Sequence, residues 1–430
     1  MIAEYPANLR MALFPQGVPI MRSGNNRFGF LLICLLLLGT LAFSPVSYGD
    51  HDRLEAGRSD YSHYPQGGSL FVSVFFGSDG RLWRIVPEKQ YVYVDYSTDL
   101  GKTFSAPVRV NNDALRVKAS GENRPGIVVD GTGKIYATFA AEGAQPIEQV
   151  FSVSTDGGRS FSTPMPLSSM SSEANSFEGR LAIGPSGQPY AFWLDERDRT
   201  DWRQPGNAIY FRELGPGDGN HSVDRKLADT VCECCRIAVS FDHAGYPVVL
   251  ARFVYPGDMR DLGLVQLGSD GRPFSSRATH DQWELKGCPE HGPALSIGSD
   301  NHYHIAWFTQ GSARQGLFYA FSSDGGQRFS QPQPFGTPGR MPSHPDVLAS
   351  GRNVFLTWVE FDAERSHLLF MRSGDGGETW SSPVQVAESR ASSDFPFLLT
   401  GPRGVFISWN SKKEGYRLIP ITPAASSSDR

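Results

Sequence analysis

The 430-residue sequence predicts an all-β protein, a β-propeller of four-stranded antiparallel blades, with seven blades preferred and six as the alternative. Composition is the first indication. Aromatic residues make up 12% of the chain and charged residues 20%, while Gly and Pro number 46 and 30. These values are typical of a turn-rich globular β protein. Two repeated patterns then indicate which β fold it is.

The first pattern is an octet that occurs four times. Each copy has a Ser, an Asp two positions later, a Gly four positions later and an aromatic residue seven positions later: STDLGKTF from Ser97, STDGGRSF from Ser154, SSDGGQRF from Ser322 and SGDGGETW from Ser373. An Asp that accepts backbone N–H groups, followed by a Gly with positive φ, is typical of a tight turn. We therefore expect each octet to join two antiparallel strands, with its aromatic side chain packed back under them.

The spacing of the octets gives the period of the repeat. Successive copies start 57, 168 and 51 residues apart, and 168 is three times 56. Two degenerate copies are therefore expected between the second and third octets, around Asp218 and Asp270. The last unit has no octet, so we expect residues 50–69 to supply its fourth strand and close the ring. In the six-bladed alternative, the first or last unit is broken up.

The second pattern is a set of alternating strands that end in an aromatic residue. It recurs seven times, as RLWRIV, KIYATFA, YAFWLDE, VVLARFV, HIAWFTQ, VFLTWVE and VFISWNS. Trp193 and Trp307 are 114 residues apart, twice 57, and Trp307, Trp358 and Trp409 follow each other at intervals of 51. Evenly spaced short strands, about four to a unit, are typical of a propeller, in which radial repetition protects the sheet edges.

An apolar segment near the N-terminus predicts export. Residues 28–43 are almost wholly apolar, Arg27 precedes them, and small residues precede a possible cleavage site before Asp50. This pattern resembles a secretory signal peptide, and we interpret Met21 as the true start. The alternative is an uncleaved membrane anchor, although the segment is short for a spanning helix. In either case the rest of the chain is expected in the periplasm or secreted.

Charge excludes two classes of partner. The net charge is -5, the pI is about 6.1, and no run of Lys or Arg occurs. We therefore expect no nucleic-acid partner and no membrane contact beyond the signal segment. The predicted organisation is a signal region at 1–49, an N-terminal segment at 50–69, one propeller domain at 70–421 and a tail at 422–430.

The octets resemble the Asp-box, or bacterial neuraminidase repeat, of the sialidase-like β-propellers. The resemblance covers nearly all of residues 70–421. It implies a propeller fold in which the octets lie on outer turns, away from the central ligand face. Because many unrelated functions share this repeat, the resemblance carries little weight for activity.

Charged residues recur just before the predicted innermost strands, at positions that line the centre of a propeller. The candidate ligand-binding residues there are Arg124, Arg180, Arg236, Glu122, Glu178 and His344. Glu233, Glu290 and Asp394 occupy equivalent positions. Three converging guanidinium groups suit a small anionic ligand or an acidic glycan, because Arg forms bidentate contacts and stays charged. The alternative is that the acids and arginines pair across neighbouring blades and hold the ring together.

The resemblance also implies an enzyme alternative, a sialidase-like exo-glycoside hydrolase that holds an acidic sugar with an arginine triad. The family's Arg-Ile-Pro start appears only as WRIVPE at Arg84, inside a strand pattern. Tyr416 and Glu414 are the nearest match to the family's nucleophilic pair, so no catalytic residue is assigned. The stretches at 193–198 and 258–261 place acids beside arginines. They suit either general acid and base roles or salt-bridged loops.

Four cysteines remain after the signal segment. Cys232, Cys234 and Cys235 precede one innermost strand, and Cys288 precedes the next, three residues before His291. In an exported chain they can form disulfides, with three possible pairings. Adjacent Cys234 and Cys235 point to opposite sides of an extended strand, however, which makes it difficult for both to face one partner.

The same residues suit a soft metal ion. Thiolates and an imidazole favour copper(I) or zinc(II) over hard cations, with copper ahead in an exported protein. The predicted ligands are Cys232, Cys234, Cys235, Cys288 and His291, and His302 and His304 are candidates for additional contacts. The sequence thus predicts an exported propeller that binds a soft metal or a small anionic ligand at its central face. The alternatives are the sialidase-like hydrolase and a non-catalytic scaffold with structural disulfides.

Overall fold

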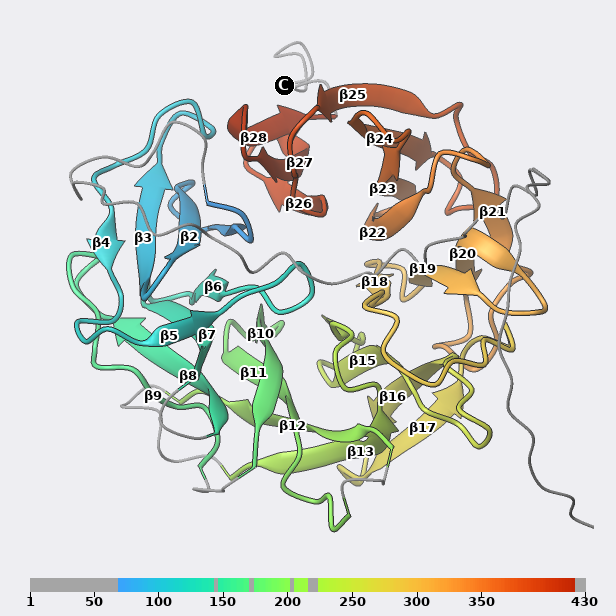
Figure 1. Ribbon diagram of the computed structural model, residues 1–430, viewed down its shortest axis with the longest axis horizontal. Coiled ribbons are helices and arrows are strands. Elements are labelled where there is room, and N and C mark those ends of the chain that lie inside the picture. The colour runs from blue at the N-terminus through green and yellow to red at the C-terminus, as the bar shows by residue number, and fades with distance from the viewer. Residues whose placement is uncertain (1–68, 143–145, 170–173, 202–204, 216–222, 422–430) are drawn as a thin grey trace, which may run out of the picture. The chain divides into compact units, whose positions relative to one another are not determined.

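The computed structural model describes residues 69–421 except 143–145, 170–173, 202–204 and 216–222. All of these residues belong to one compact unit, Tyr61–Arg430. They form seven antiparallel sheets arranged as the blades of a ring (Figure 1), so the predicted seven-bladed propeller is confirmed and the six-bladed alternative is wrong. Among the described residues none forms a helix long and apolar enough to cross a membrane. The predicted signal segment and the tail lie outside them.

Five blades have four described strands each, and in each blade the chain runs from the innermost strand to the outermost. The first blade has β1 (Ser73–Phe76), β2 (Leu82–Glu88), β3 (Tyr91–Ser97) and β4 (Val108–Arg109). The third has β10 (Ser176–Ile183), β11 (Pro189–Asp195), β12 (Asn207–Glu213) and β13 (Arg225–Val231). The fourth has β14 (Ala238–Phe241), β15 (Pro247–Arg252), β16 (Leu262–Leu267) and β17 (Pro273–Arg277). The fifth has β18 (Ala294–Ile297), β19 (Tyr303–Gln310), β20 (Gln315–Ser322) and β21 (Gln333–Phe335). The sixth has β22 (Ser343–Ser350), β23 (Asn353–Phe361), β24 (Ser366–Ser373) and β25 (Val384–Ser389).

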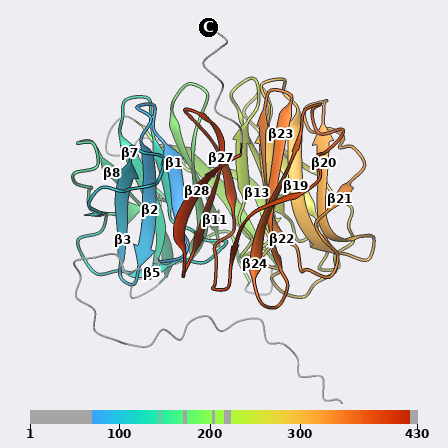
Figure 2. The ribbon, with the colours of Figure 1, turned by 90° about the horizontal axis from the view of Figure 1, so that it is seen from above.

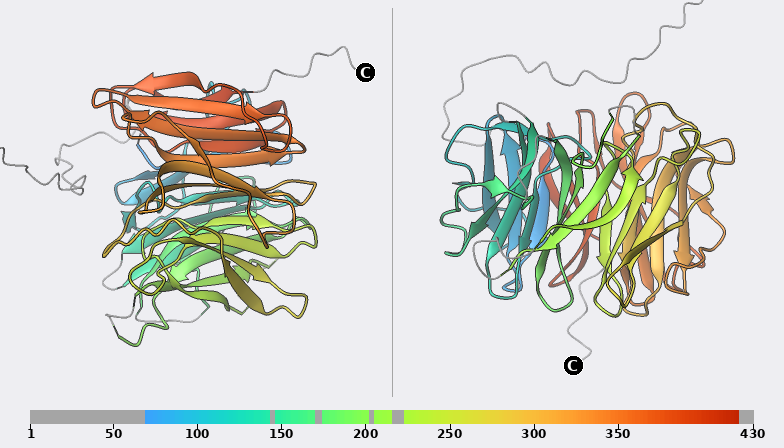
Figure 3. Two further views of the ribbon diagram at one scale, coloured as in Figure 1. Left: turned by 90° about the vertical axis from the view of Figure 1, so that its right-hand side faces the viewer. Right: turned by 90° about the horizontal axis from the view of Figure 1, so that it is seen from below.

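The second and seventh blades differ from this pattern. In the second, β5 (Arg116–Lys118) and β6 (Gly126–Val129) both pair with β7 (Ile135–Glu142), so the inner strand is interrupted. The blade continues with β8 (Ile147–Ser154) and β9 (Met165–Pro166). The seventh has three described strands, β26 (Phe397–Gly401), β27 (Gly404–Ser411) and β28 (Gly415–Pro420). In Figure 1, β6, β10, β18, β22 and β26 lie nearest the centre. Seen edge-on in Figures 2 and 3, the strands run through the thickness of the ring.

The first and seventh blades are joined by hydrogen bonds at one carboxylate. Asp394, just before β26, accepts from the backbone N–H of Phe71 at 2.7 Å and of Val72 at 3.1 Å. The side chain of Asn410 in β27 also donates to the carbonyl of Ser69 at 2.7 Å. These contacts close the ring between its two chain ends. The predicted closing strand at 50–69 lies outside the described residues apart from Ser69.

Each octet forms the turn between the third and fourth strands of its blade. In the first copy, Asp99 Oδ1 accepts from Ser97 Oγ at 2.7 Å and from Thr103 N at 2.9 Å. Gly101 has a φ of 79°, and its N–H donates to Ser97 Oγ at 2.8 Å. The other three copies repeat these features, and their aromatic residues pack against the cores: Phe161, Phe329 and Trp380. Asp270 lies in the corresponding turn between β16 and β17, whereas Asp218 lies outside the described residues.

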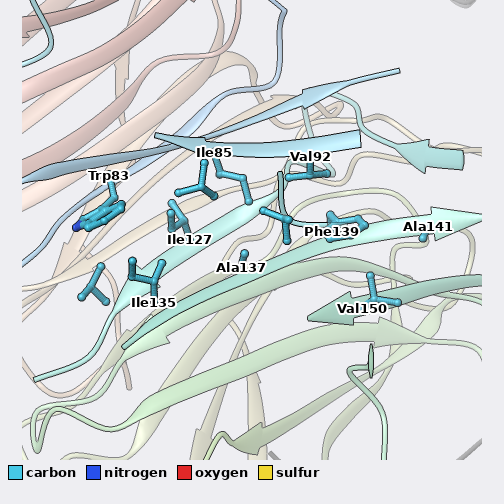
Figure 4. Close-up of a cluster of buried hydrophobic side chains, with 12 residues drawn as sticks. Trp83, Ile85, Val92, Ile127, Ile135, Ala137, Phe139, Ala141 and Val150 are labelled. Atoms are coloured by element: carbon cyan, nitrogen blue, oxygen red, sulfur yellow. The ribbon is translucent and has the colours of Figure 1, made fainter. Parts of the chain in front are cut away.

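The hydrophobic cores lie between neighbouring blades. The aromatic residues of the second strands are fully buried there, as Trp193, Trp307, Trp358 and Trp409 illustrate. Figure 4 shows one such core, in which Trp83, Ile85 and Val92 of the first blade face Ile127 and Phe139 of the second. Burial on both faces of the second strands makes their buried runs nearly continuous, as in β7, β15 and β23, whereas the sequence pattern predicted alternation. This burial also fixes the blades around a common axis, where the inner strands begin.

Candidate functional site

The entries to the inner strands have an irregular backbone. Phe71, Glu178, Glu290 and His344 occupy similar positions in four blades, and each has a positive φ between 49° and 69°. β-bulges interrupt the pairing of β10 with β11 and of β22 with β23 at two of these residues. Left-handed backbone at non-Gly residues costs free energy, and bulges redirect side chains out of the strand alternation. Strained backbone of this kind concentrates at functional sites.

Glu122 links four blades near the axis. Its Oε2 accepts from the backbone N–H of Arg236 and of Gly292, both at 2.8 Å. Its Oε1 accepts from Arg236 Nη1 at 3.0 Å, and Arg236 Nη2 donates to the carbonyl of Pro345 at 3.1 Å. Glu122 and Arg236 are only 4% and 3% exposed. This buried ion pair therefore connects the second, fourth, fifth and sixth blades.

The other two candidate arginines also bond within the protein. Arg124 Nη2 donates to the carbonyl of Phe395 at 3.1 Å, and burial lowers the pKa of Arg124 to about 10. Arg180 Nη2 donates to the carbonyl of Glu122 at 3.0 Å, and its Nε donates to that of Ile237 at 3.3 Å. The three guanidinium groups thus converge as predicted, and their contacts agree with the ring-holding interpretation. Binding of an outside ligand by them stays a prediction.

Two carboxyl groups near the axis, those of Glu178 and Asp346, have raised pKa values. Burial raises the pKa of Glu178 well above its usual value, and its Oε2 makes no hydrogen bond to a described residue. Burial also raises the pKa of Asp346 to about 6, although its Oδ2 accepts from Leu398 N at 2.7 Å. Buried carboxyls resist ionisation unless they are paired, so these two acids hold protons more tightly than surface acids do.

The two axial histidines lie in a stack of aromatic rings. His344 packs on Phe395 with ring centroids 3.3 Å apart and on His291 at 4.4 Å, and His291 packs on Phe308 at 4.2 Å. His344 Nε2 lies 3.2 Å from the carbonyl oxygen of Glu290. Burial, together with nearby arginines, lowers the pKa of His291 to about 3 and that of His344 well below its usual value. Both imidazoles are therefore neutral at physiological pH.

The four cysteines meet between the fourth and fifth blades. Their sulfur atoms all lie within 4.8 Å of one another. Cys234 and Cys288 form a disulfide with Cα atoms 6.2 Å apart, and Cys232 and Cys235 are free buried thiols. Cys232 Sγ lies 3.5 Å from Cys235 Sγ and 3.8 Å from Cys288 Sγ. Cys288 is exposed, so the cluster extends from the surface into the interior.

The local chain explains why the sequence argument against a shared partner is wrong. Residues 233–235 form a turn and a bend between β13 and β14, not an extended strand. Adjacent Cys234 and Cys235 therefore do not alternate across a sheet, and both reach the same cluster. Glu233 holds this turn in place, because its carboxylate accepts from Gly206 N at 2.8 Å and from Arg260 Nη1 at 3.1 Å.

The structure does not place the predicted histidine ligands in this cluster. His291 stacks in the axial ring ladder and is not among the grouped residues. His302 lies in the turn after β18, 3.5 Å from Asp300, and His304 Nδ1 lies 2.7 Å from Tyr319 OH. The turn after β18 is at the opposite end of that strand from the cysteines, so these two histidines cannot add contacts to a metal at the cluster.

The two free thiols differ in acidity. A hydrogen bond from Cys235 lowers the pKa of Cys232 to about 7, and nearby Arg260 acts in the same direction. Burial raises the pKa of Cys235 well above its usual value. Arg260, in the β15–β16 loop, belongs to the acid–arginine stretch 258–261, but the sequence did not connect it with the cysteines, and it did not predict the pairing of Cys232 with Cys235. The Cys-x-x-Cys spacing within CECC was the available signal for the pair.

The two acid–arginine stretches at 193–198 and 258–261 are salt-bridged, and Arg260 of the second stretch reaches the cysteine cluster through Glu233. Arg197 Nη2 lies 2.6 Å from Asp195 Oδ2, and its Nη1 lies 2.9 Å from Asp224. Asp261 pairs with Arg277. These ion pairs agree with the salt-bridged interpretation of the two stretches.

The residues compared with the sialidase pattern lie apart from the inner strand entries. Arg84 of β2 binds Asp95 of β3 at 2.7 Å. Tyr416 lies in β28, and Glu414 accepts from Ser411 Oγ at 2.7 Å in the turn before it. The structure therefore does not bring these residues together with the three axial arginines.

Comparison with known proteins gives a likeness of fold. No protein-family model and no curated protein matches the sequence. A solved ulvan lyase of polysaccharide lyase family PL25, bound to -[GlcA(1-4)Rha3S]-, has a TM-score of 0.54 at 10% identity over 80% of this chain and 90% of that chain. The polysaccharide lyase Uly1 has a TM-score of 0.50 at 8% identity over 87% and 92%. The Hadza microbial sialidase Hz136 has a TM-score of 0.48 at 12% identity over 78% and 74%. The chain thus has the β-propeller fold of these lyases.

Proposed function

We propose that this protein is an exported propeller that binds a single soft metal ion, copper(I) or zinc(II), through Cys232, Cys234, Cys235 and Cys288. The observation that carries the proposal is that the four sulfur atoms lie within 4.8 Å of one another. Export is the second part of the proposal. The apolar N-terminal segment supports it.

The sulfur spacing suits a small soft cation. Four Zn–S bonds of about 2.3 Å in a tetrahedron place the sulfurs roughly 3.8 Å apart. Cys232 Sγ lies at 3.5 Å and 3.8 Å from two of the other sulfurs, which is close to this value. Thiolates select copper(I) and zinc(II) over hard cations. Because thiolates are the ligands, the proposal requires that the Cys234–Cys288 disulfide be reduced before the metal binds.

Titration of the reduced protein tests the proposal. The protein is reduced without oxygen, freed of reductant and titrated with copper(I) or zinc(II) against a chromogenic chelator. We expect it to remove a single ion per chain from the chelator, and Cys235→Ser to weaken the binding at least tenfold. His302→Gln is the matched control, since His302 lies outside the cluster. If the wild-type protein bound the metal no more strongly than Cys235→Ser does, the proposal would be overturned.

Binding of an acidic glycan is a second candidate. It is supported by the fold likeness to the ulvan lyase, whose structure holds a glucuronate-containing sugar. Arg180 is the least buried of the three axial arginines and would meet such a ligand first. Calorimetry with sulfated glucuronate oligosaccharides would give weaker binding for Arg180→Gln than for the wild type. Absence of heat with the wild type at millimolar sugar would remove this candidate.

A further inference from the structure

The four cysteines divide into two pairs that differ in oxidation state and access. Cys234 and Cys288 form a disulfide that reaches the surface, because Cys288 is exposed. Cys232 and Cys235 are thiols that are 0% and 1% exposed. One sulfur contacts both pairs: Cys232 Sγ lies 3.5 Å from Cys235 Sγ and 3.8 Å from Cys288 Sγ. A reduced pair is thus held against an oxidised pair within one cluster.

We infer that the cluster is an internal thiol–disulfide relay in which the buried pair Cys232/Cys235 reduces the surface disulfide Cys234–Cys288. First, the Cys232 thiolate attacks Cys288 Sγ, the Cys232–Cys288 bond forms, and Cys234 leaves as a thiolate with the electron pair. Then the Cys235 thiolate attacks Cys232 Sγ, the Cys232–Cys235 bond forms, and Cys288 leaves as a thiolate. The protons of Cys232 and Cys235 pass to Cys234 and Cys288. Bonds and electrons balance without an outside oxidant or reductant.

The local chain favours this exchange. Thiol–disulfide exchange requires contact between the attacking sulfur and the disulfide, and fixed proximity replaces a bimolecular encounter. Backbone contacts hold Cys232 at the junction, since its N–H donates to the carbonyl of Arg252 at 2.7 Å. Glu233 anchors the turn that carries the other two cysteines through Gly206 and Arg260. Cys232 and Cys235 also have the Cys-x-x-Cys spacing, which closes a small disulfide loop.

The relay would move a disulfide between the surface and the interior. After exchange, Cys234 and Cys288 are two thiols that reach the surface, and the disulfide bond joins the buried Cys232 and Cys235. An external dithiol or disulfide would meet Cys288 first, because the buried sulfurs are closed to solvent. The inference rests on the sulfur contacts and not on the proposed metal binding, because metal-free protein is expected to exchange.

The test maps the disulfide of metal-free, singly oxidised protein. Fully reduced protein is treated with chelator, oxidised with one equivalent of diamide, kept at mildly alkaline pH without added thiol, and quenched in acid. Free thiols are then alkylated before and after reduction with two different reagents, and the labels are assigned by fragment mass spectrometry. We expect a mixture of two species, one with Cys232 and Cys235 free and one with Cys234 and Cys288 free.

Two serine variants isolate the steps. In Cys235→Ser the exchange should stop at Cys232–Cys288, with Cys234 labelled as a free thiol in part of the protein. In Cys232→Ser only Cys234–Cys288 should form. A wild type in which Cys232 and Cys235 are both fully free after a day would overturn the relay, even if the variants do not fold. Metal uptake by such a protein would leave the proposed function intact, whereas exchange without metal uptake would overturn only the metal proposal.

Discussion

The outer turns and the axial entries both recur around the ring, yet they are built in opposite ways. The four octets repeat the same contacts, and all of them fall within eight residues, as Ser373 and Asp375 illustrate. The axial entries differ from blade to blade and depend on distant partners. Glu122 bonds to residues 114 and 170 positions away along the chain. The octets thus stabilise locally the four blades that carry them, while the axial contacts hold the blades to one another.

The difference indicates where a propeller of this kind acquires a function. Residues whose side chains bond the backbone of their own turn are needed for folding, so they change little between blades. Residues at the axis take no part in these turns, so each blade can contribute a different side chain to a common site. Here the fourth and fifth blades contribute cysteines together with Arg236 and His291, and other blades contribute acids, arginines and His344. Three substitutions test how far this division holds.

The largest effect is expected from Glu122→Ala. The change leaves Arg236 without its buried partner and orphans the N–H groups of Arg236 and Gly292. Breaking a buried ion pair costs about 3–5 kcal/mol. Urea unfolding should report this loss, with Glu122→Gln, which keeps the shape, losing less. A loss below about 1 kcal/mol, the size expected at a surface pair, would mean that the axis does not hold the blades together.

An intermediate effect is expected at the outer turns. Gly377 has a φ of 94°, and a Cβ there would collide with the hydroxyl of Tyr319. Gly377→Ala should therefore lower the free energy of unfolding by about 2–3 kcal/mol, from overpacking and backbone strain together. Gly376→Ala is the matched control, because Gly376 has a similar φ of 85° but open space around it. Equal melting temperatures for the two variants would show that the octet turn is not packed as described.

The smallest effect is a pH dependence at Asp346. Burial raises its pKa to about 6 in the folded protein, so the native state binds this proton more tightly than the unfolded chain does. Its contribution to stability is complete below the unfolded pKa of 3.8 and is lost as the pH rises through about 6. Between pH 5 and 7 the wild type should lose about 1 kcal/mol relative to Asp346→Asn. A constant difference in unfolding free energy across this range would contradict the raised pKa.

The fold could be predicted because the contacts that define each blade join residues close together in the sequence. The octet contacts span four residues, and the tryptophans of the second strands recur at the blade period. Each unit therefore carries its own turn and its own core residue. Blade number followed from counting these units. The closing contacts at Asp394 could not be predicted in the same way, because they join residues 323 positions apart.

The sequence predicted which residues gather at the candidate site, but not which partners their side chains contact. The charged positions before the inner strands do converge, and the four cysteines do meet. Their partners depend on ring geometry, and the predicted ligand His291 packs between Phe308 and His344 instead. Cys234 and Cys235 were predicted in an extended strand, whereas they lie in a turn and a bend that bring the sulfurs together. Local backbone at the axis is therefore what the sequence pattern could not provide.

The proposed metal site at the irregular axial entry of the fourth blade can be tested with copper(I). The reduced protein is exposed to excess copper(I), passed through a gel-filtration column and submitted to elemental analysis. We expect close to a single equivalent of copper per chain, and a background level in a variant with Cys232, Cys234, Cys235 and Cys288 all replaced by Ser. Equal copper in the two proteins would mean that the four cysteines do not bind the metal.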